Sequence, residues 1–189
     1  MARRIPRGAL SVGLPCVAQR KDYTCGAAAV LAVSAYYGVG PATEDAVVRD
    51  MGFGPEGSDP AHLIKALRRY GLRHAETRGM MDGELRARLD RGHPVILMLQ
   101  AWGELSSYRH AWSDGHWVVA IGHDARGLYL EDPLIESARG FLSWPALAER
   151  WHDLEGRTRR RVHRYGLAVW SPRARAQLAI HCDTIINVA

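Results

Sequence analysis

The first half of the chain carries hydrophobic positions at helical spacing. Leu63, Ile64 and Leu67 share one face of a predicted helix, because residues three and four apart lie on the same side. The segment 25–37 reads CGAAAVLAVSAYY, which is rich in strong helix formers, and it follows Thr24, a residue type favoured at helix starts. The pattern predicts helices at 25–37, 44–51, 60–70 and 82–90, with a short strand at 72–77.

The second half carries apolar runs of strand length. PVILMLQ and HWVVAIGH are continuous enough to be buried strands. Helices followed by strands indicate an α+β fold rather than alternating βαβ units. The pattern predicts strands at 94–100, 116–123, 128–131 and 162–170 and a helix at 142–155, and the TIINV segment near the end is strand-like.

Length and charge favour one globular domain. The chain has 189 residues, and its longest apolar runs are far shorter than the ~18–20 residues of a membrane helix, so no membrane span is expected. The net charge of +5 is concentrated in 1–11 and in the arginines of 157–164. Two short clusters are typical of a solvated tail and a strand edge, so no nucleic-acid partner is expected. We expect a basic segment at 1–11, a domain at 12–170 and a tail at 171–189.

The cysteines indicate a reducing compartment. Cys16, Cys25 and Cys182 give an odd count, so a disulfide scaffold is not expected, and no CxxC pair suggests zinc. The N-terminus begins basic, but Gly13 and Pro15 interrupt its apolar stretch, unlike a signal peptide. A cytoplasmic protein is therefore expected.

Cys25 is the first candidate for chemistry. It falls in the first turn of a strong predicted helix, where unpaired N–H groups and the positive end of the dipole stabilise a thiolate. Gly26 places no side chain beside the sulfur, which leaves room for a substrate carbonyl. The position alone also fits a small buried cysteine at a helix start, which is the usual role of a free cysteine.

Three polar residues elsewhere are candidates to act with this cysteine. His116 stands where a polar loop enters a buried strand, and Asp132 ends the next strand. A hairpin that pairs Asp124 with Leu128 would put both on one sheet face. Gln19, at the end of an extended piece, can donate its amide N–H to an oxyanion. Each residue type also fits a structural role, such as an Asp-Pro turn after a strand.

Other residues are weaker candidates. Asp114 and Asp124 are rivals to Asp132, and His123 at the far end of the same strand represents the structural histidines. Three tryptophans near His116 could line a cleft for an extended peptide, although Trp117 is expected to pack in the core. These three are Trp102, Trp112 and Trp117.

Taken together, these residues resemble a known family. Gln-x5-Cys-Gly-Ala-Ala, His-Trp-Val-Val-x-x-Gly and Tyr-x-x-Asp-Pro, with sixteen residues from His116 to Asp132, resemble the C39 family of papain-like cysteine peptidases. Those domains process bacteriocin-type leader peptides after a double glycine. The resemblance covers roughly 12–170. It implies a papain-like fold, with the Cys in an N-terminal helical part and the His and Asp in a C-terminal antiparallel sheet.

The resemblance also implies roles and partners. Cys25 would be the nucleophile, His116 the general base and then acid, Asp132 its orienting partner, and Gln19 part of the oxyanion hole. A peptide or protein would be the substrate, with glycine favoured before the scissile bond, and no metal or cofactor is needed. Many family members are fused to a membrane transporter. This chain has no phosphate-binding GxxxxGK[ST] loop, so a free-standing domain with a separate transporter partner is expected.

Several alternatives stay open at this point. The same fold could bind peptides without cleaving them, or the same cysteine could serve a transferase or deamidase, because only access of water to the acyl-enzyme decides hydrolysis. A zinc site is disfavoured by the lack of local ligand pairs. The tail at 171–189 could pack on the core, swap between protomers or occupy the cleft, and its Cys182 could be an oxidation partner for Cys25.

Overall fold

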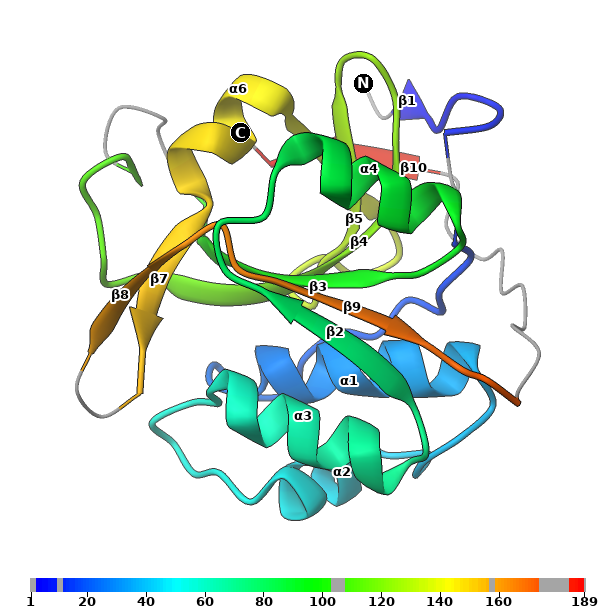
Figure 1. The fold of residues 1–189 in the computed structure, drawn as a ribbon, viewed down its shortest axis with the longest axis vertical. Helices are drawn as coiled ribbons and strands as arrows, with labels where there is room; N and C mark the ends of the chain where they lie inside the picture. Colours follow the sequence, from blue (N-terminus) through cyan, green and yellow to red (C-terminus); the bar gives the residue numbers. More distant parts are fainter. Residues whose placement is uncertain (1–2, 10–11, 103–107, 157–158, 174–183, 189) are drawn as a thin grey trace.

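A mixed sheet separates two helical layers (Figure 1). The computed structural model describes the chain apart from residues 1–2, 10–11, 103–107, 157–158, 174–183 and 189. The helices are α1 (Cys25–Tyr36), α2 (Glu44–Met51), α3 (Pro60–Arg69), α4 (Asp82–Asp90) and α6 (Trp144–Arg150). The strands are β1 (Arg3–Arg4), β2 (Arg73–Thr77), β3 (Val95–Gln100), β4 (Gly115–His123), β5 (Gly127–Glu131), β6 (Arg139–Ser143), β7 (His152–Glu155), β8 (Arg160–His163), β9 (Gly166–Trp170) and β10 (Thr184–Asn187).

The main sheet is mostly antiparallel. In the part of the chain that the structure describes, its strands follow the order β1-β10-β6-β5-β4-β3-β9-β2, and β7 and β8 form a separate hairpin. Neighbours in the main sheet run antiparallel except β10, which runs parallel to β6. The predicted α+β class is confirmed: α1, α2 and α3 come first, and the central strands come from the second half.

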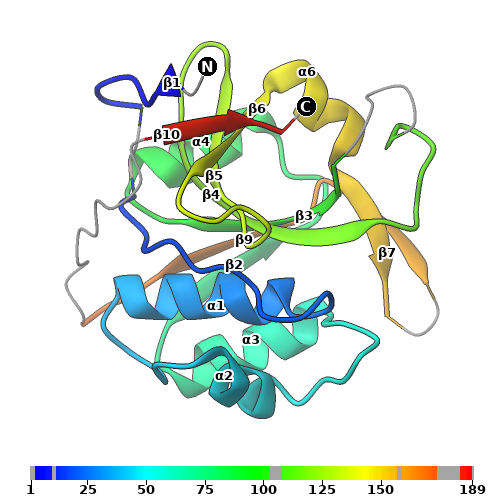
Figure 2. The same ribbon diagram turned by 180° about the vertical axis from the view of Figure 1, so that it is seen from behind.

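Strand β4 is buried on both faces, which explains its continuous apolar sequence. Successive side chains of a strand point to opposite faces. Trp117 and Val119 therefore join the core that includes α1, α2 and α3, whereas Val118 and Ala120 join the core under α4 and α6. Figure 2 shows the three N-terminal helices together on one side of the sheet, with α4 and α6 on the other.

Helix α1 lies between the sheet and the other N-terminal helices. Ala28, Val30 and Val33 are fully buried, and the helix contacts β4 as well as α2 and α3. Its alanines are small enough for close approach on several sides while retaining high helix propensity. The first residue of α1, Cys25, is therefore held against the central strands.

Two predicted elements are wrong. The helix expected at 142–155 is only α6, because Ser143 caps it by accepting a hydrogen bond from Ala146 N at 3.3 Å, and the residues on either side pair in β6 and β7. The strand expected at 162–170 is two strands. Arg164 breaks it with a φ of 54°, a backbone conformation that cannot continue a strand.

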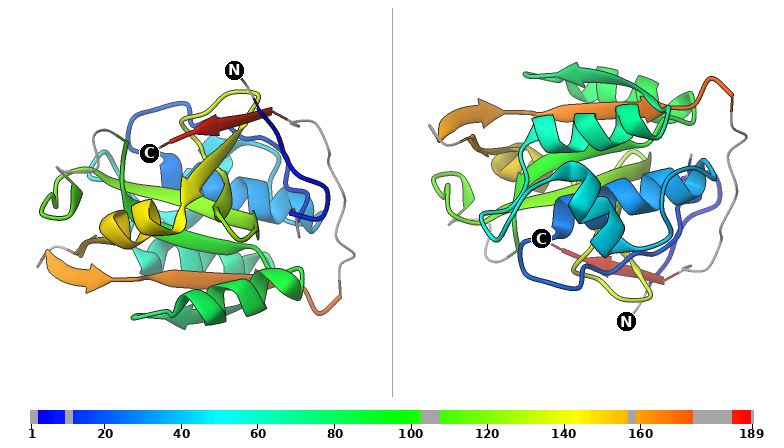
Figure 3. Two further views of the ribbon diagram at one scale, coloured as in Figure 1. Left: turned by 90° about the horizontal axis from the view of Figure 1, so that it is seen from above. Right: turned by 90° about the horizontal axis from the view of Figure 1, so that it is seen from below.

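The two ends of the chain meet at one edge of the sheet (Figure 3). Strand β1 pairs with β10, and β10 pairs with β6. Thr184–Asn187 of the tail thus packs onto the sheet, which is one of the three predicted placements. No helix in the described ranges is long and apolar enough to cross a membrane.

Candidate active site

Cys25 begins α1 and carries a free thiol. It is only 8% exposed. Thr24 occupies the N-cap position but makes no side-chain hydrogen bond to the helix; its hydroxyl accepts from Lys21 N at 3.1 Å and donates to Lys21 O at 2.9 Å. Thr24, which was expected to cap the helix, therefore closes a tight turn that leads into it. The first-turn N–H groups of α1 are left to stabilise negative charge at the sulfur.

His116 and Asp132 form a buried pair. His116 Nε2 lies 2.7 Å from Asp132 Oδ1, and the residues are 4% and 0% exposed. Asp132 Oδ1 also accepts a hydrogen bond from Leu134 N at 2.9 Å, which fixes the carboxylate. Because a carboxylate only accepts, Nε2 is the donor, and Nδ1 remains for the second partner of the ring. The side chain of Cys25 also interacts with the ring and favours its charged form.

The imidazole of His116 is held in its charged form. Burial of the ring disfavours the charge, but the hydrogen bonds to Asp132 and Cys25, together with the charges of both, outweigh it and raise the pKa of His116 to about 9. At neutral pH the ring is therefore an imidazolium that lies between Asp132 and Cys25.

The β4–β5 hairpin brings this histidine and aspartate together. The predicted pairing of Asp124 with Leu128 is wrong: His123 lies opposite Leu128, and a β-bulge in β4 shifts the register further. The two shifts together displace β5 by two residues along β4. Because side chains alternate, a two-residue displacement keeps His116 and Asp132 on the same face, as predicted, and brings them closer.

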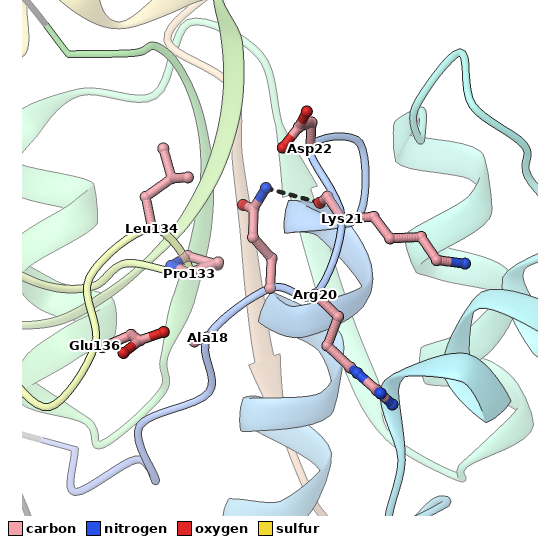
Figure 4. Close-up of a pocket in the computed structure, with 8 residues that line it drawn as sticks. Ala18, Arg20, Lys21, Asp22, Pro133, Leu134 and Glu136 are labelled. Carbon is pink, nitrogen blue, oxygen red and sulfur yellow. Dashed lines mark hydrogen bonds between the residues drawn. The ribbon is translucent and has the colours of Figure 1, made fainter.

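Gln19 lies beside a small cavity that the loop after β5 also lines. The cavity has a volume of about 160 Å³ and includes Pro133 and Leu134 on its wall. Figure 4 shows Pro133 and Leu134 on one side of this cavity and Arg20 and Lys21 on the other. Gln19 N donates to Pro133 O at 2.9 Å, and its side-chain Nε2 donates to Lys21 O at 2.9 Å. Gln19 is thus tied directly to the residue that follows Asp132.

The rival residues occupy other places. Asp124 closes the β4–β5 turn through Arg126 and Tyr129, and Asp114 bonds through its backbone N–H to Gln100. His123 lies 2.9 Å from Asp90, as a structural histidine at the far end of β4.

The three tryptophans differ in their surroundings. Trp117 packs in the core, as expected, and donates to Ser58 O at 3.0 Å. Trp112 packs against His152 and under Arg161 of the β7–β8 hairpin, so it does not flank the imidazole of His116. Trp102 does flank the imidazole of His116, because its ring lies edge-on to it with 6.0 Å between the ring centroids.

Gly26 has a different role from the one expected. A Cβ at this position would lie 2.1 Å from Ser58 Oγ and 3.1 Å from Trp117 Cδ1. The space beside Gly26 is therefore filled by the loop before α3 and by β4, and is not open for a substrate carbonyl. Glycine at this position allows the start of α1 to pack closely against the sheet.

Sequence reasoning missed two buried polar residues whose contacts reach the backbone just before His116. Gln100 and Asp153 are 0% and 8% exposed. Gln100 Oε1 accepts from Asp114 N at 3.1 Å, and its Nε2 donates to Asp153 Oδ1 at 2.9 Å. A Cβ at Gly115 would lie 2.2 Å from Asp153 Oδ2, so the carboxyl lies against the backbone just before His116. A polar residue that ends a buried strand, as Gln100 does, is the available sequence signal.

Asp153 provides a test of this packing through pH. Burial, with a contribution from Asp114, raises the pKa of Asp153 to about 6, against hydrogen bonds from Leu154 and Gln100. The native state therefore binds the proton more tightly than the unfolded chain, and stability is lost as pH rises from about 4 to about 6. At 1.36 kcal/mol for each pKa unit, the loss is about 3 kcal/mol.

We expect Asp153→Asn not to lose stability as the pH rises, because asparagine carries no titrating carboxyl group. In urea unfolding, the variant should gain free energy of unfolding relative to the wild type at about pH 7.5 and lose that gain at about pH 4. A constant offset between the two proteins at both pH values would contradict the placement of Asp153 in a desolvated site.

The cysteines are in different states. Cys25 is a free thiol, whereas Cys16 is disulfide-bonded. Cys182, suggested as an oxidation partner for Cys25, lies outside the described residues. Among the described residues, no group of three or more His, Cys, Asp or Glu side chains is arranged to hold a metal ion.

Comparisons with known proteins show which fold this is. A putative C39-like peptidase from Bacillus anthracis superimposes with a TM-score of 0.68 at 14% identity, over 89% of this chain and 98% of the other. A double glycine motif protease from an AMS/PCAT transporter, in complex with its leader peptide, gives 0.58 at 21% identity over 89% and 97%. The peptidase domain of Streptococcus ComA, a bi-functional ABC transporter, gives 0.57 at 16% over 84% and 98%. The fold is that of the papain-like cysteine peptidases.

The sequence match is more specific than the fold. Residues 12–158 match the model of the Peptidase_C39 like family, and the chain belongs to this family. No curated protein matches the sequence significantly.

Proposed function

We propose that the chain is a cysteine peptidase whose nucleophile is Cys25. The observation that carries the proposal is the buried line of contacts from Asp132 through His116 to Cys25. A nucleophile, a base in contact with it and a third group that orients the base are the parts needed for acyl transfer through a thiol.

The proposed reaction has two steps. The Cys25 sulfur attacks the scissile carbonyl carbon and forms a thioester as the bond from carbon to the amide nitrogen breaks, and His116 gives its proton to the leaving amine. His116 then accepts a proton from water, which attacks the thioester and restores the thiolate. Asp132 keeps the ring oriented throughout. No cofactor takes part in either step.

Gln19 is proposed as an oxyanion donor. One N–H of its side-chain amide donates to Lys21 O, which leaves the second N–H for the oxygen that becomes negative in the tetrahedral intermediate. The backbone N–H of Cys25, at the positive end of α1, would be the second donor.

The surroundings of the sulfur favour a small residue before the scissile bond. Cys25 is almost fully buried, and the packing of Gly26 against Ser58 leaves no free volume beside it. Glycine, including a double glycine, fits such narrow access. The leader peptide bound by the double glycine motif protease supports a peptide substrate of this kind. A separate transporter partner is proposed by analogy with the transporter-borne domains.

Paired peptides test this function. A peptide with Gly-Gly before the scissile bond and a matched one with Val-Val are incubated with the wild type and Cys25→Ala, and products are identified by mass. We expect cleavage after Gly-Gly at least about 10-fold faster than after Val-Val, and none by the variant. Equal cleavage of both peptides would contradict the specificity. Binding of the peptide without cleavage by the wild type would indicate a peptide-binding domain instead.

A further inference from the structure

The segment 12–20 links the sheet to the start of α1 and carries Gln19. It has no regular secondary structure, so its position depends on contacts with the rest of the fold. Val12 N donates to Ile121 O at 2.9 Å at one end, and Gln19 N donates to Pro133 O at 2.9 Å near the other. Arg20 N donates to the buried carboxylate of Glu44 at 3.0 Å. Between these points the segment needs other partners.

A buried ion pair supplies them. Glu131 and Arg139 bond to each other and are 1% and 2% exposed. Glu131 Oε1 accepts from Val17 N at 2.7 Å, and Arg139 donates to Leu14 O. One ion pair therefore satisfies two backbone groups of the segment. Because each charge is desolvated, each depends on the other and on these backbone partners.

The location of Glu131 connects this ion pair to the proposed chemistry. Glu131, Asp132 and Pro133 are consecutive. Glu131 accepts a hydrogen bond from Val17 N, and Asp132 bonds to His116. The carbonyl of Pro133 accepts from Gln19 N. The end of β5 thus contacts both sides of the site within three residues.

We propose that the Glu131–Arg139 ion pair is a positioning device that sets the oxyanion donor Gln19 relative to His116. The inference rests on the proposed function of Gln19. Glu131 and Arg139 touch neither substrate nor sulfur in this scheme and act only through the segment 12–20. Glu131 is therefore a residue whose loss impairs steps that develop an oxyanion and spares steps that do not.

Two reactions of Cys25 separate these effects. Acylation by N-acetylglycine p-nitrophenyl ester passes through a tetrahedral oxyanion, transfers the acyl group to sulfur and releases p-nitrophenolate. Alkylation by iodoacetamide displaces iodide from carbon and forms no oxyanion. We expect Glu131→Gln to slow acylation by about 10-fold or more and to leave alkylation within about two-fold of the wild type.

A double-mutant cycle shows whether the effect runs through Gln19. We expect Gln19→Ala to slow acylation by about 10²-fold, and Glu131→Gln to cause no further loss in that background. Multiplicative losses would overturn the proposal, because they would mean that Glu131 acts elsewhere. Glu155→Gln is the matched control. It breaks the two ion pairs that Glu155, at the end of β7, makes with Arg78 and Arg160, and it should change neither reaction.

A second variant covers the case in which Glu131→Gln does not fold. Glu131→Gln combined with Arg139→Met removes both buried charges, so no unpaired charge is left. Its circular dichroism should match the wild type, and its acylation should be about 10-fold slower or more; acylation at the wild-type rate overturns the proposal. Failure of the proposed function looks different. In that case the wild type itself is not acylated, and its alkylation is no faster than that of His116→Ala.

Discussion

Replacement of His116 by alanine is expected to lower the rate of peptide cleavage by about 10³-fold. In the proposed mechanism the imidazole acts with Cys25 and returns a proton to the leaving amine. Among the described side chains, those of Asp132 and Cys25 interact with the ring to favour its charged form. The measurement is the single-turnover rate of the Gly-Gly peptide under saturating enzyme.

His123→Ala is the matched control for this loss. His123 lies in the same strand and also bonds to an aspartate, Asp90, but at the other end of β4. We expect the cleavage rate of this variant to equal that of the wild type. A His116→Ala protein that folds normally and cleaves at more than about one tenth of the wild-type rate would contradict the assignment of His116 as base.

The largest expected effect on stability comes from Gly127→Ala. A Cβ on Gly127, the first residue of β5, would lie 2.3 Å from Leu142 O and 2.8 Å from Ser143 Cα. Both are backbone atoms of the neighbouring β6, which cannot move away without breaking the pairing of the two strands. We expect the variant to lose about 3 kcal/mol or more of unfolding free energy in urea.

Gly83→Ala gives the opposite expectation for the same chemical change. Gly83 lies in α4, and a Cβ there would meet no atom within 4 Å. Alanine in a helix should stabilise the protein by about 0.5–1 kcal/mol over glycine. If both variants unfold at the wild-type urea midpoint, the close approach of β5 and β6 is contradicted.

Local sequence patterns predicted the elements whose structure depends on near neighbours. Helices α1 to α4 follow helical spacing and start and stop residues, and β3 and β4 follow from continuous apolar runs. The region 142–155 failed because Phe141 and Leu142 pair with β5 and His152–Glu155 pairs with β8. Strand pairing over these distances overrode a helical pattern of tryptophans and leucines.

The candidate site was predicted in part. Motif spacing pointed to His116 and Asp132, and the structure brings them within hydrogen-bond distance. The strand register that brings these two residues together depends on a bulge in β4, and no local sequence pattern predicted that bulge. The contacts that hold the segment 12–20 involve Glu131, Arg139 and Glu44, and the one between Arg139 and Leu14 joins residues 125 positions apart along the chain. Such long-range polar contacts leave no periodic trace in a single sequence.

Alkylation of the thiol across pH tests the central claim that Cys25 and His116 form a reactive pair. Wild type, His116→Ala and Cys25→Ser are treated with iodoacetamide from about pH 5 to about pH 10, and adducts are assigned by intact mass and peptide mapping.

The account predicts rapid labelling of Cys25 in the wild type below about pH 7. The labelling rate should change again as His116 loses its proton near pH 9. His116→Ala should lose the rapid phase at low pH, and Cys25→Ser should show no adduct at position 25. If Cys25 of the wild type reacts no faster than that of His116→Ala at any pH, the pair does not exist and the peptidase assignment fails.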